Sequence, residues 1–134
     1  MKQYLLDTNA VVDLLRDNKG PVARHIADVG ISACAMCDIT LYELYYGAYC
    51  STNVSRNLEA VERLKSFIPI ITSSDSFTEA AAQKARLRKD GQLIEDFDIL
   101  IGCTAITTDR ILVSDNDRHL GRLDGVKMEN WLRD

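Results

Sequence analysis

The chain has 134 residues, of which 46% are hydrophobic and 27% are charged. This length and composition are those of one globular domain with a substantial core, and they exclude an intrinsically disordered chain. The formal net charge of −4 lacks the basic excess that usually accompanies nucleic-acid binding. The charge does not exclude such binding, because carboxylates that hold metal ions make a site acidic in sequence while the bound ions reverse its sign.

The chain also lacks the features of an exported or membrane protein. Its first residues contain no long apolar stretch followed by small residues, so we expect no signal peptide. No apolar run approaches the roughly 20 residues that span a bilayer. We therefore expect a soluble, cytoplasmic protein without a membrane partner.

In chain order, apolar periodicity alternates between the patterns of strands and helices. Gly20-Pro21 opens one helix, and Ser74-Asp75-Ser76 is expected to cap another. The patterns predict a strand at 4–6, helices at 10–16 and 22–29, a strand at 31–37, helices at 41–49 and 53–66, a strand at 69–72, helices at 77–90 and 96–106, and strands at 111–114 and 126–129.

Strands that alternate with helices imply a three-layer α/β/α domain with a mainly parallel central sheet. Neither an internal repeat nor an interdomain linker is visible. The whole chain, 1–134, is therefore predicted to be a single domain.

Two of the four cysteines form a Cys-x-x-Cys pair, Cys34 and Cys37. This spacing occurs in zinc and redox sites. Here the pair lies in a small apolar run that is typical of a buried strand, and no second Cys or His pair completes a zinc set. Buried thiols are the better interpretation.

Four acidic residues occupy places where parallel α/β proteins bind ligands, beyond the carboxyl ends of the strands. Asp7 and Asp115 directly follow apolar strands. Glu43 lies early in the helix after the second strand. Asp98 lies in the first turn of the apolar helix that precedes the fourth strand. We expect these four carboxylates to face one crevice.

Such a cluster favours a bound cation. Two carboxylates about 4 Å apart repel by roughly 4 kcal/mol at an effective dielectric constant of 20. Oxygen ligands without His or Cys indicate Mg²⁺ or Mn²⁺ rather than zinc. These ions activate water and stabilise the charge of a phosphoryl group, so the cluster predicts a metal-dependent nuclease.

Each acid also has a structural interpretation. Asp7 caps a helix in that alternative, Asp98 interacts with a helix dipole, Glu43 is a solvated helix residue, and Asp115 or Asp117 belongs to a turn. The placement of all of them at one sheet edge favours the functional interpretation.

Four segments in the same order resemble PIN-domain ribonucleases, specifically the VapC-type toxins of bacterial toxin–antitoxin systems. The segments are LLDTN (5–9), ITLYELYYG (39–47), FDILIG (97–102) and LVSDN (112–116). The C-terminal GVKMENW (125–131) is also similar to theirs. The resemblance therefore spans nearly the whole chain.

The resemblance implies roles for individual residues. Asp7 and Asp98 are metal ligands in this interpretation, and Glu43 completes the site directly or through water. The fourth position is Asp115, Asn116 or Asp117, of which we favour Asp115. Thr8 and Ser114 support the cluster through hydrogen bonds.

The resemblance further implies hydrolysis of RNA phosphodiester bonds by a metal-activated water. It implies two protein partners, a cognate antitoxin that plugs the nuclease groove and a second copy of the chain. The helix at 41–49 and the arm at 53–66 are candidate surfaces for either partner. Lys84, Arg86, Arg88 and Lys89 on one helix are candidates for phosphate contacts, with a solvated charged face as the alternative.

Two other functions remain as alternatives. A phosphotransferase of the haloacid-dehalogenase type also places an Asp after its first strand, but it needs a second Asp two residues later, where this chain has Asn9. A catalytically inactive PIN-like interaction module ranks higher among the alternatives. The presence of Asp7, Glu43 and Asp98 argues against it.

Overall fold

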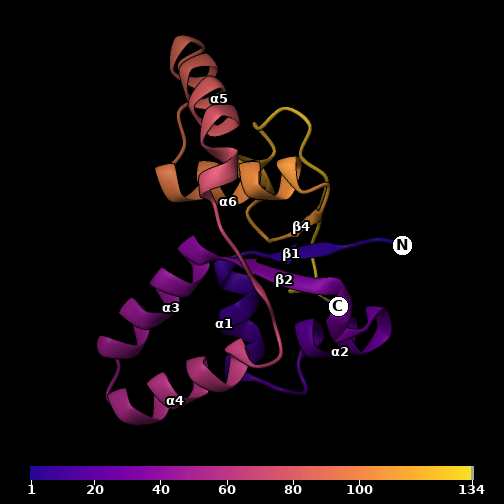
Figure 1. The fold of residues 1–134 in the computed structure, drawn as a ribbon, viewed down its shortest axis with the longest axis vertical. Helices are drawn as coiled ribbons and strands as arrows, with labels where there is room; N and C mark the ends of the chain where they lie inside the picture. Colours follow the sequence, from indigo (N-terminus) through magenta and orange to yellow (C-terminus); the bar gives the residue numbers. More distant parts are fainter. Residues whose placement is uncertain (134) are drawn as a thin grey trace.

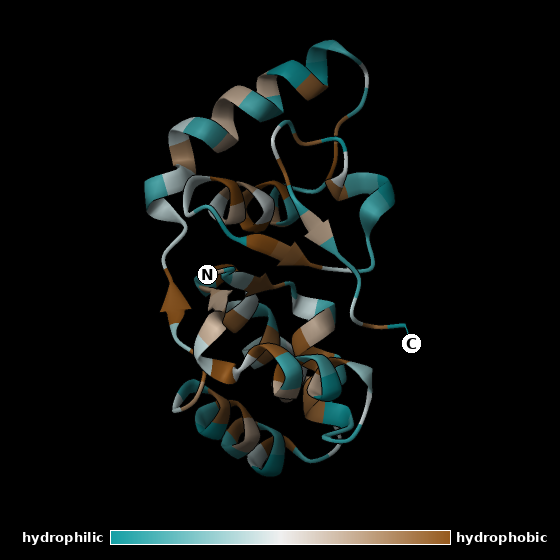
Figure 2. Cartoon of the chain, turned by 90° about the vertical axis from the view of Figure 1, so that its right-hand side faces the viewer, coloured by the Kyte–Doolittle hydropathy of each residue, from teal (hydrophilic) through white to brown (hydrophobic). Residues whose placement is uncertain are grey.

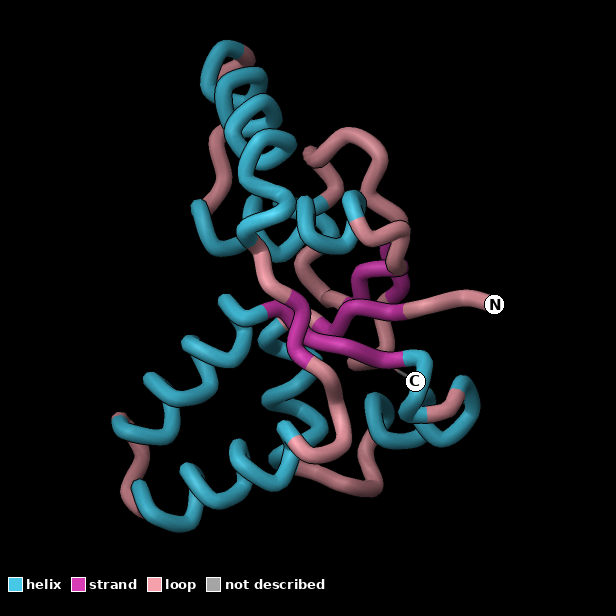
Figure 3. The backbone as a smooth tube through the Cα atoms, in the orientation of Figure 1, coloured by secondary structure: helices cyan, strands magenta, loops and turns pink. Residues whose placement is uncertain are grey.

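The structure is a computed structural model and describes residues 1–133, so Asp134 of the predicted 1–134 domain lies outside the described residues. Within this range the strands are β1 (Tyr4–Leu6), β2 (Cys34–Cys37), β3 (Ile70–Ile71), β4 (Ile111–Val113) and β5 (Met128–Glu129). They form one sheet in the order β3-β2-β1-β4-β5, and every neighbouring pair is parallel. The strands are the magenta segments at the centre of Figure 3. The predicted parallel sheet is confirmed.

Helices cover both faces of this sheet. They are α1 (Thr8–Arg16), α2 (Pro21–Val29), α3 (Asp38–Tyr49), α4 (Val54–Lys65), α5 (Phe77–Lys89), α6 (Asp96–Thr107) and α7 (Asp117–Leu120), with short 3₁₀ turns η1 (Ile31–Ala33) and η2 (Ser74–Ser76). Helices α1 to α4 lie on one side of the strands, and α5 and α6 lie on the other (Figure 1). The predicted three-layer α/β/α architecture is confirmed.

Alternation along the central strand divides the core between the two faces. Tyr4 and Leu6 of β1 point into a cluster with α1, α2 and Trp131, whereas Leu5 points into a second cluster with α5 and α6. Leu5 and Leu6 are fully buried. Strands that are apolar on both faces are characteristic of parallel sheets covered by helices. Figure 2 shows the mainly brown, apolar strands between helices in which teal and brown residues are mixed.

The predicted strand at 31–37 is wrong over its first three residues. Gly30 has a φ of +90°, a left-handed value that turns the chain, and Ile31–Ala33 then form a 3₁₀ turn. The Ala33 amide donates to the Gly30 carbonyl at 3.1 Å. Ile31 is 42% exposed, so its apolar side chain is not part of a buried strand.

The other differences concern the ends of elements. The segment Ser74–Ser76, expected to be a cap, forms η2 and makes no side-chain cap for α5. Helix α3 begins at Asp38, directly after β2, and strand β3 contains only Ile70 and Ile71. The short helix α7 had no counterpart in the predicted elements.

The cysteines confirm the buried-thiol interpretation. Cys34, Cys37 and Cys103 are buried, and burial raises the pKa of each thiol to about 11. A thiol with such a pKa is protonated at neutral pH and is a poor nucleophile or metal ligand. Separately, none of the helices within residues 1–133 is long and apolar enough to cross a bilayer.

Candidate active site

The predicted acidic residues meet at the carboxyl edge of the sheet because the strands that precede them are parallel neighbours. Asp7 follows β1, Ser114 follows β4, and Glu43 lies in α3, which follows β2 directly. The Asp7 amide donates to the Val113 carbonyl at 2.9 Å, which extends the β1–β4 pairing to this point. The backbone therefore brings three distant segments together before any side chain contributes.

Among the described residues, Asp7 is the most deeply buried acid, and the residue is only 5% exposed. Ser114 Oγ donates to its Oδ2 at 2.7 Å, and the Thr8 amide donates to its Oδ1 at 2.8 Å. Burial raises the pKa of Asp7, and the nearby charges of Glu43 and Asp115 raise it further, while the two hydrogen bonds oppose this shift. The predicted supporting roles of Thr8 and Ser114 agree with these contacts.

Glu43 is oriented by a pair of threonines. Thr8 Oγ1 donates to Glu43 Oε1 at 2.7 Å and lies 3.1 Å from Thr40 Oγ1. Thr40 is completely buried. Thr40 was not predicted from the sequence to belong to the site. It lies three residues before Glu43, a spacing that places both side chains on one face of a helix.

Asp98 enters the cluster from the opposite layer, in the first turn of α6. Burial raises its pKa to about 6, with further increases from Asp7, Glu43 and Glu95 and a decrease from His119. Asn116 Nδ2 donates to Asp98 Oδ2 at 3.4 Å. Asp7 and Asp98 are therefore carboxylates for which the charged form is disfavoured in the protein alone.

The segment after β4 brings two of the three fourth-position candidates to the cluster. Asp115 acts on the pKa of Asp7 through its charge, and its Oδ1 accepts a 3.4 Å hydrogen bond from Asn9. Asn116 contacts Asp98 through its side chain, and its amide donates to Ser114 Oγ at 3.0 Å. Asp117 is exposed, and no hydrogen bond within the described residues joins its carboxylate to the other acids. The choice thus narrows to Asp115 and Asn116.

The donor chemistry of the cluster fits a hard divalent cation. Every candidate ligand is an oxygen atom. Burial first, and then the neighbouring carboxylates, raise the pKa of Asp7 and of Asp98, so a bound cation would stabilise their charged forms. Within residues 1–133, no three acidic, His or Cys side chains already stand in a geometry that would hold one metal ion.

Four basic residues of α5 were candidates for phosphate contacts, and two of them have structural roles. Lys84 Nζ lies 2.7 Å from Asp96 Oδ1. Arg86 Nε lies 3.0 Å from Asp124 Oδ2, and its Nη2 donates to the Arg122 carbonyl at 2.8 Å. These contacts join α5 to α6 and to the segment after α7, so these two side chains are committed to the fold.

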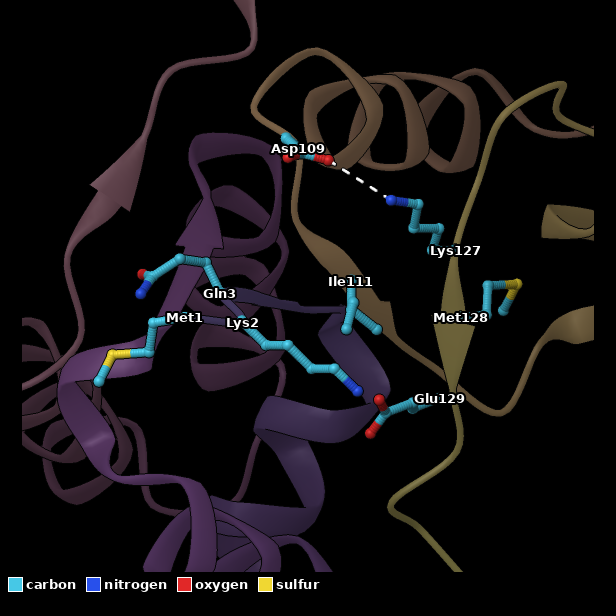
Figure 4. A pocket seen from close by; sticks show the side chains of 8 residues that line it. All are labelled: Met1, Lys2, Gln3, Asp109, Ile111, Lys127, Met128 and Glu129. Carbon is cyan, nitrogen blue, oxygen red and sulfur yellow. Dashed lines mark ion pairs between the residues drawn. The ribbon is translucent and has the colours of Figure 1, made fainter.

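A hollow of about 540 Å³ lies at the other edge of the sheet (Figure 4). Gln3 and Asp109, which precede β1 and β4, belong to its lining. Its charges are partly paired, with Lys127 Nζ 3.6 Å from Asp109 Oδ1. None of the acids that cluster around Asp7 lines this hollow, so it is not the active site.

Comparison with known proteins identifies the family of the chain. The PIN domain family model matches residues 4–126. The chain therefore belongs to the PIN-domain family. At 35% identity over 98% of this chain and 100% of the relative, it is similar to ribonuclease VapC2 of Haemophilus influenzae. It is 31% identical to the tRNA(fMet)-specific endonuclease VapC of Salmonella typhimurium, over 98% of this chain and 99% of the relative.

Solved structures give the same result. The fold is similar to that of a chain in the DNA-bound VapBC complex of Salmonella typhimurium, with a TM-score of 0.89, 26% identity and coverage of 98% and 99% of the two chains. It is also similar to a chain of Rickettsia felis VapBC2 bound to a promoter DNA fragment, with a TM-score of 0.86, 26% identity and coverage of 96% and 98%.

The raised pKa of Asp98 predicts a pH-dependent effect on stability. Its pKa is about 6 in the folded protein, above the ordinary value of 3.8, so ionisation destabilises the metal-free fold as pH rises through this interval. At pH 7 in chelator, Asp98→Asn is expected to increase the free energy of unfolding by on the order of 1–2 kcal/mol, after allowing for solvent screening. Denaturant unfolding at several pH values measures this.

The difference between Asp98→Asn and the wild type should shrink as the pH falls below about 6 and disappear only at about pH 3, where Asp98 is largely protonated in both the folded and the unfolded states. Asp75→Asn, at an exposed position in η2, serves as the control and should not reproduce the profile. An Asp98→Asn variant that is less stable than the wild type at pH 7 would contradict the interpretation of Asp98 as a destabilising charge.

Proposed function

We propose that this chain is a metal-dependent endoribonuclease that hydrolyses RNA phosphodiester bonds as the toxin of a type II toxin–antitoxin pair. The observation that carries the proposal is the convergence of Asp7, Glu43 and Asp98 at one sheet edge in a chain of the PIN-domain family. The ribonuclease and endonuclease names of its relatives support it, as do the toxin–antitoxin complexes among its structural neighbours.

The proposed metal ligands are Asp7 and Asp98, with Glu43 completing the site directly or through water and Asp115 as the fourth acid. A bound Mg²⁺ or Mn²⁺ supplies a water molecule of lowered pKa and offsets the charge on the phosphoryl group. Ser114 and the Thr8 amide fix the Asp7 carboxylate, and Thr8 Oγ1 fixes Glu43. Water is the nucleophile, so no side chain forms a bond to phosphorus.

Asn9 argues against the phosphotransferase alternative. Its side-chain amide donates to Asp115 Oδ1 at 3.4 Å, and an amide at this position supplies no general acid. The inactive-module alternative would require the loss of an acid from the cluster. Asp7, Glu43 and Asp98 are all present. Thr8 donates to both Asp7 and Glu43, and Asn116 donates to Asp98 and to Ser114, which in turn donates to Asp7.

Cleavage of RNA tests the proposal directly, and initiator transfer RNA is a suitable first substrate because a relative carries it in its name. Asp7→Asn and Asp98→Asn are each expected to lower the cleavage rate by about 100-fold or more, because each removes a charged metal ligand. EDTA should abolish cleavage, and either Mg²⁺ or Mn²⁺ should restore it. Gel analysis of end-labelled RNA measures the rates.

Asp115→Asn and Asn116→Ala, measured in the same assay, decide the fourth position. We expect the larger loss for Asp115→Asn, while Asp117→Asn retains activity. Cleavage that survives both Asp7→Asn and Asp98→Asn, or that is indifferent to chelator, would contradict the proposed chemistry.

For the antitoxin, the proposed docking surface is a groove of about 430 Å³ between α1, α3 and α4. Apolar side chains that include Val12, Leu15 and Leu44 line it, and Glu43 lies at one of its borders. A peptide that fills this groove therefore reaches the acidic site. The proposed face for a second copy is the outer surface of α3, where Tyr42, Tyr46 and Tyr49 are 59%, 67% and 66% exposed. The proposed location of the complex is the cytoplasm.

Gly47→Arg tests the antitoxin groove without disturbing the core. Gly47 lines the groove, and a Cβ atom there would meet nothing within 4 Å, so the arginine projects into the space that the antitoxin would fill. We expect at least a tenfold loss of antitoxin affinity, about 1.4 kcal/mol, with unchanged RNA cleavage. Calorimetry with the purified antitoxin measures the affinity.

Ser55→Arg, at an exposed position of α4 outside the groove lining, is the matched control and should bind the antitoxin normally. Full affinity of Gly47→Arg would show that the antitoxin docks elsewhere.

A further inference from the structure

A second hollow, of about 410 Å³, lies beside the acidic cluster. Its lining consists of Lys84, Leu93, Ile94, Glu95, Asp96 and His119. It adjoins the proposed active site, because Glu95 directly precedes α6, which carries Asp98 in its first turn. Both Glu95 and His119 are near enough for their charges to act on Asp98. A substrate bound at Asp98 therefore lies next to this hollow.

Contacts from two other elements hold the walls of the hollow in place. Arg122 Nη1 donates to the carbonyls of Gln92 and Leu93 at 3.2 and 3.4 Å, which fixes the segment before α6. The 2.7 Å ion pair between Lys84 and Asp96 joins the hollow's border on α5 to α6. Helices α5 and α6 also pack directly on one another (Figure 1). The hollow is thus largely formed before a ligand binds.

The side chains around the hollow suit a nucleobase better than a phosphate. Leu93 is 47% exposed and offers apolar surface, and the exposed His119 offers a flat ring for stacking. Lys84, the lysine of the lining, is paired with Asp96. An anion in the hollow would therefore face the Glu95 carboxylate while this lysine is already engaged. Within residues 1–133, the Glu95 carboxylate forms no hydrogen bond or ion pair.

We propose that this hollow is a base-specificity subsite that binds guanine beside the scissile phosphate, with Glu95 as the specificity-determining residue. A carboxylate accepts two hydrogen bonds side by side and donates none. Guanine presents two adjacent N–H donors, from N1 and N2, on its Watson–Crick edge, whereas adenine, cytosine and uracil each place an acceptor beside a donor there. The subsite deepens the proposed ribonuclease function and rests on it.

Mononucleotide binding to the cleavage-impaired Asp7→Asn variant tests the subsite independently of catalysis. We expect GMP to shift the methyl resonances of Leu93 and Ile94, with binding about 10- to 100-fold tighter than for AMP. IMP lacks the N2 donor and should bind more weakly than GMP. Adding Glu95→Gln should remove the preference for GMP, whereas Glu59→Gln, an exposed acid on α4, should leave it intact.

Cleavage of short single-stranded RNAs that differ only in one guanine or adenine provides the second readout. The protein is expected to cut beside guanine, and Glu95→Gln should reduce the guanine-to-adenine rate ratio towards one while cleavage continues. Equal binding of GMP and AMP, or an unchanged ratio in Glu95→Gln, would overturn the subsite even if RNA is cut. Absence of all cleavage together with selective GMP binding would instead overturn the ribonuclease function.

Discussion

The cost of burying several carboxylates at one sheet edge, to which their mutual repulsion adds, is the constraint on which the rest of the site depends. Asp7 is almost fully buried, and Ser114 and the Thr8 amide compensate only part of the cost of its charge. Asp98 faces the same charges from the opposite layer. A protein gains no stability from such an arrangement by itself, and a cation held by these charged oxygen atoms would offset its cost.

The fold supplies this arrangement through the topology of its sheet. Strand β1 is central, and its parallel pairing with β2 and β4 brings the starts of α1 and α3 and the segment after β4 to one edge. Helix α6, on the other face, adds Asp98. The acids therefore come from four segments that are distant in sequence, and their positions depend on the whole sheet. The α1–α3–α4 groove and the hollow beside His119 share no lining residue, which allows separate surfaces for a protein partner and for RNA.

Much of this organisation was predictable from the sequence. The apolar runs before Asp7 and Asp115 indicated strands that end at one edge, and the position of Asp98 near the start of an apolar helix was read correctly. These predictions succeeded because the type and order of strongly periodic elements are encoded by local patterns, although the exact ends of several elements differ from the prediction. The carboxylate of Glu43 was also expected there, and the structure places it in contact with Thr8.

Other features depended on tertiary contacts that local patterns do not encode. The sequence of Ile31–Ala33 matches the pattern of a strand, but Gly30 has a left-handed φ that redirects the chain, and the segment forms a 3₁₀ helix. Thr40 supports the site only because α3 follows β2 without a loop. Likewise, the contact of Asn116 with Asp98 and the closeness of His119 to it arise from the packing of α7 against α6.

Proton release on metal binding tests the central claim most directly. If Mn²⁺ resolves the repulsion among Asp7, Glu43 and Asp98, its binding must displace the proton that Asp98, with a pKa of about 6, partly retains. Calorimetric titration at pH 5.5 in buffers of different ionisation enthalpy should show this release, which should fade by about pH 8 and be lost in Asp98→Asn. Equally tight binding to Asp98→Asn, or binding without proton release at pH 5.5, would contradict the account.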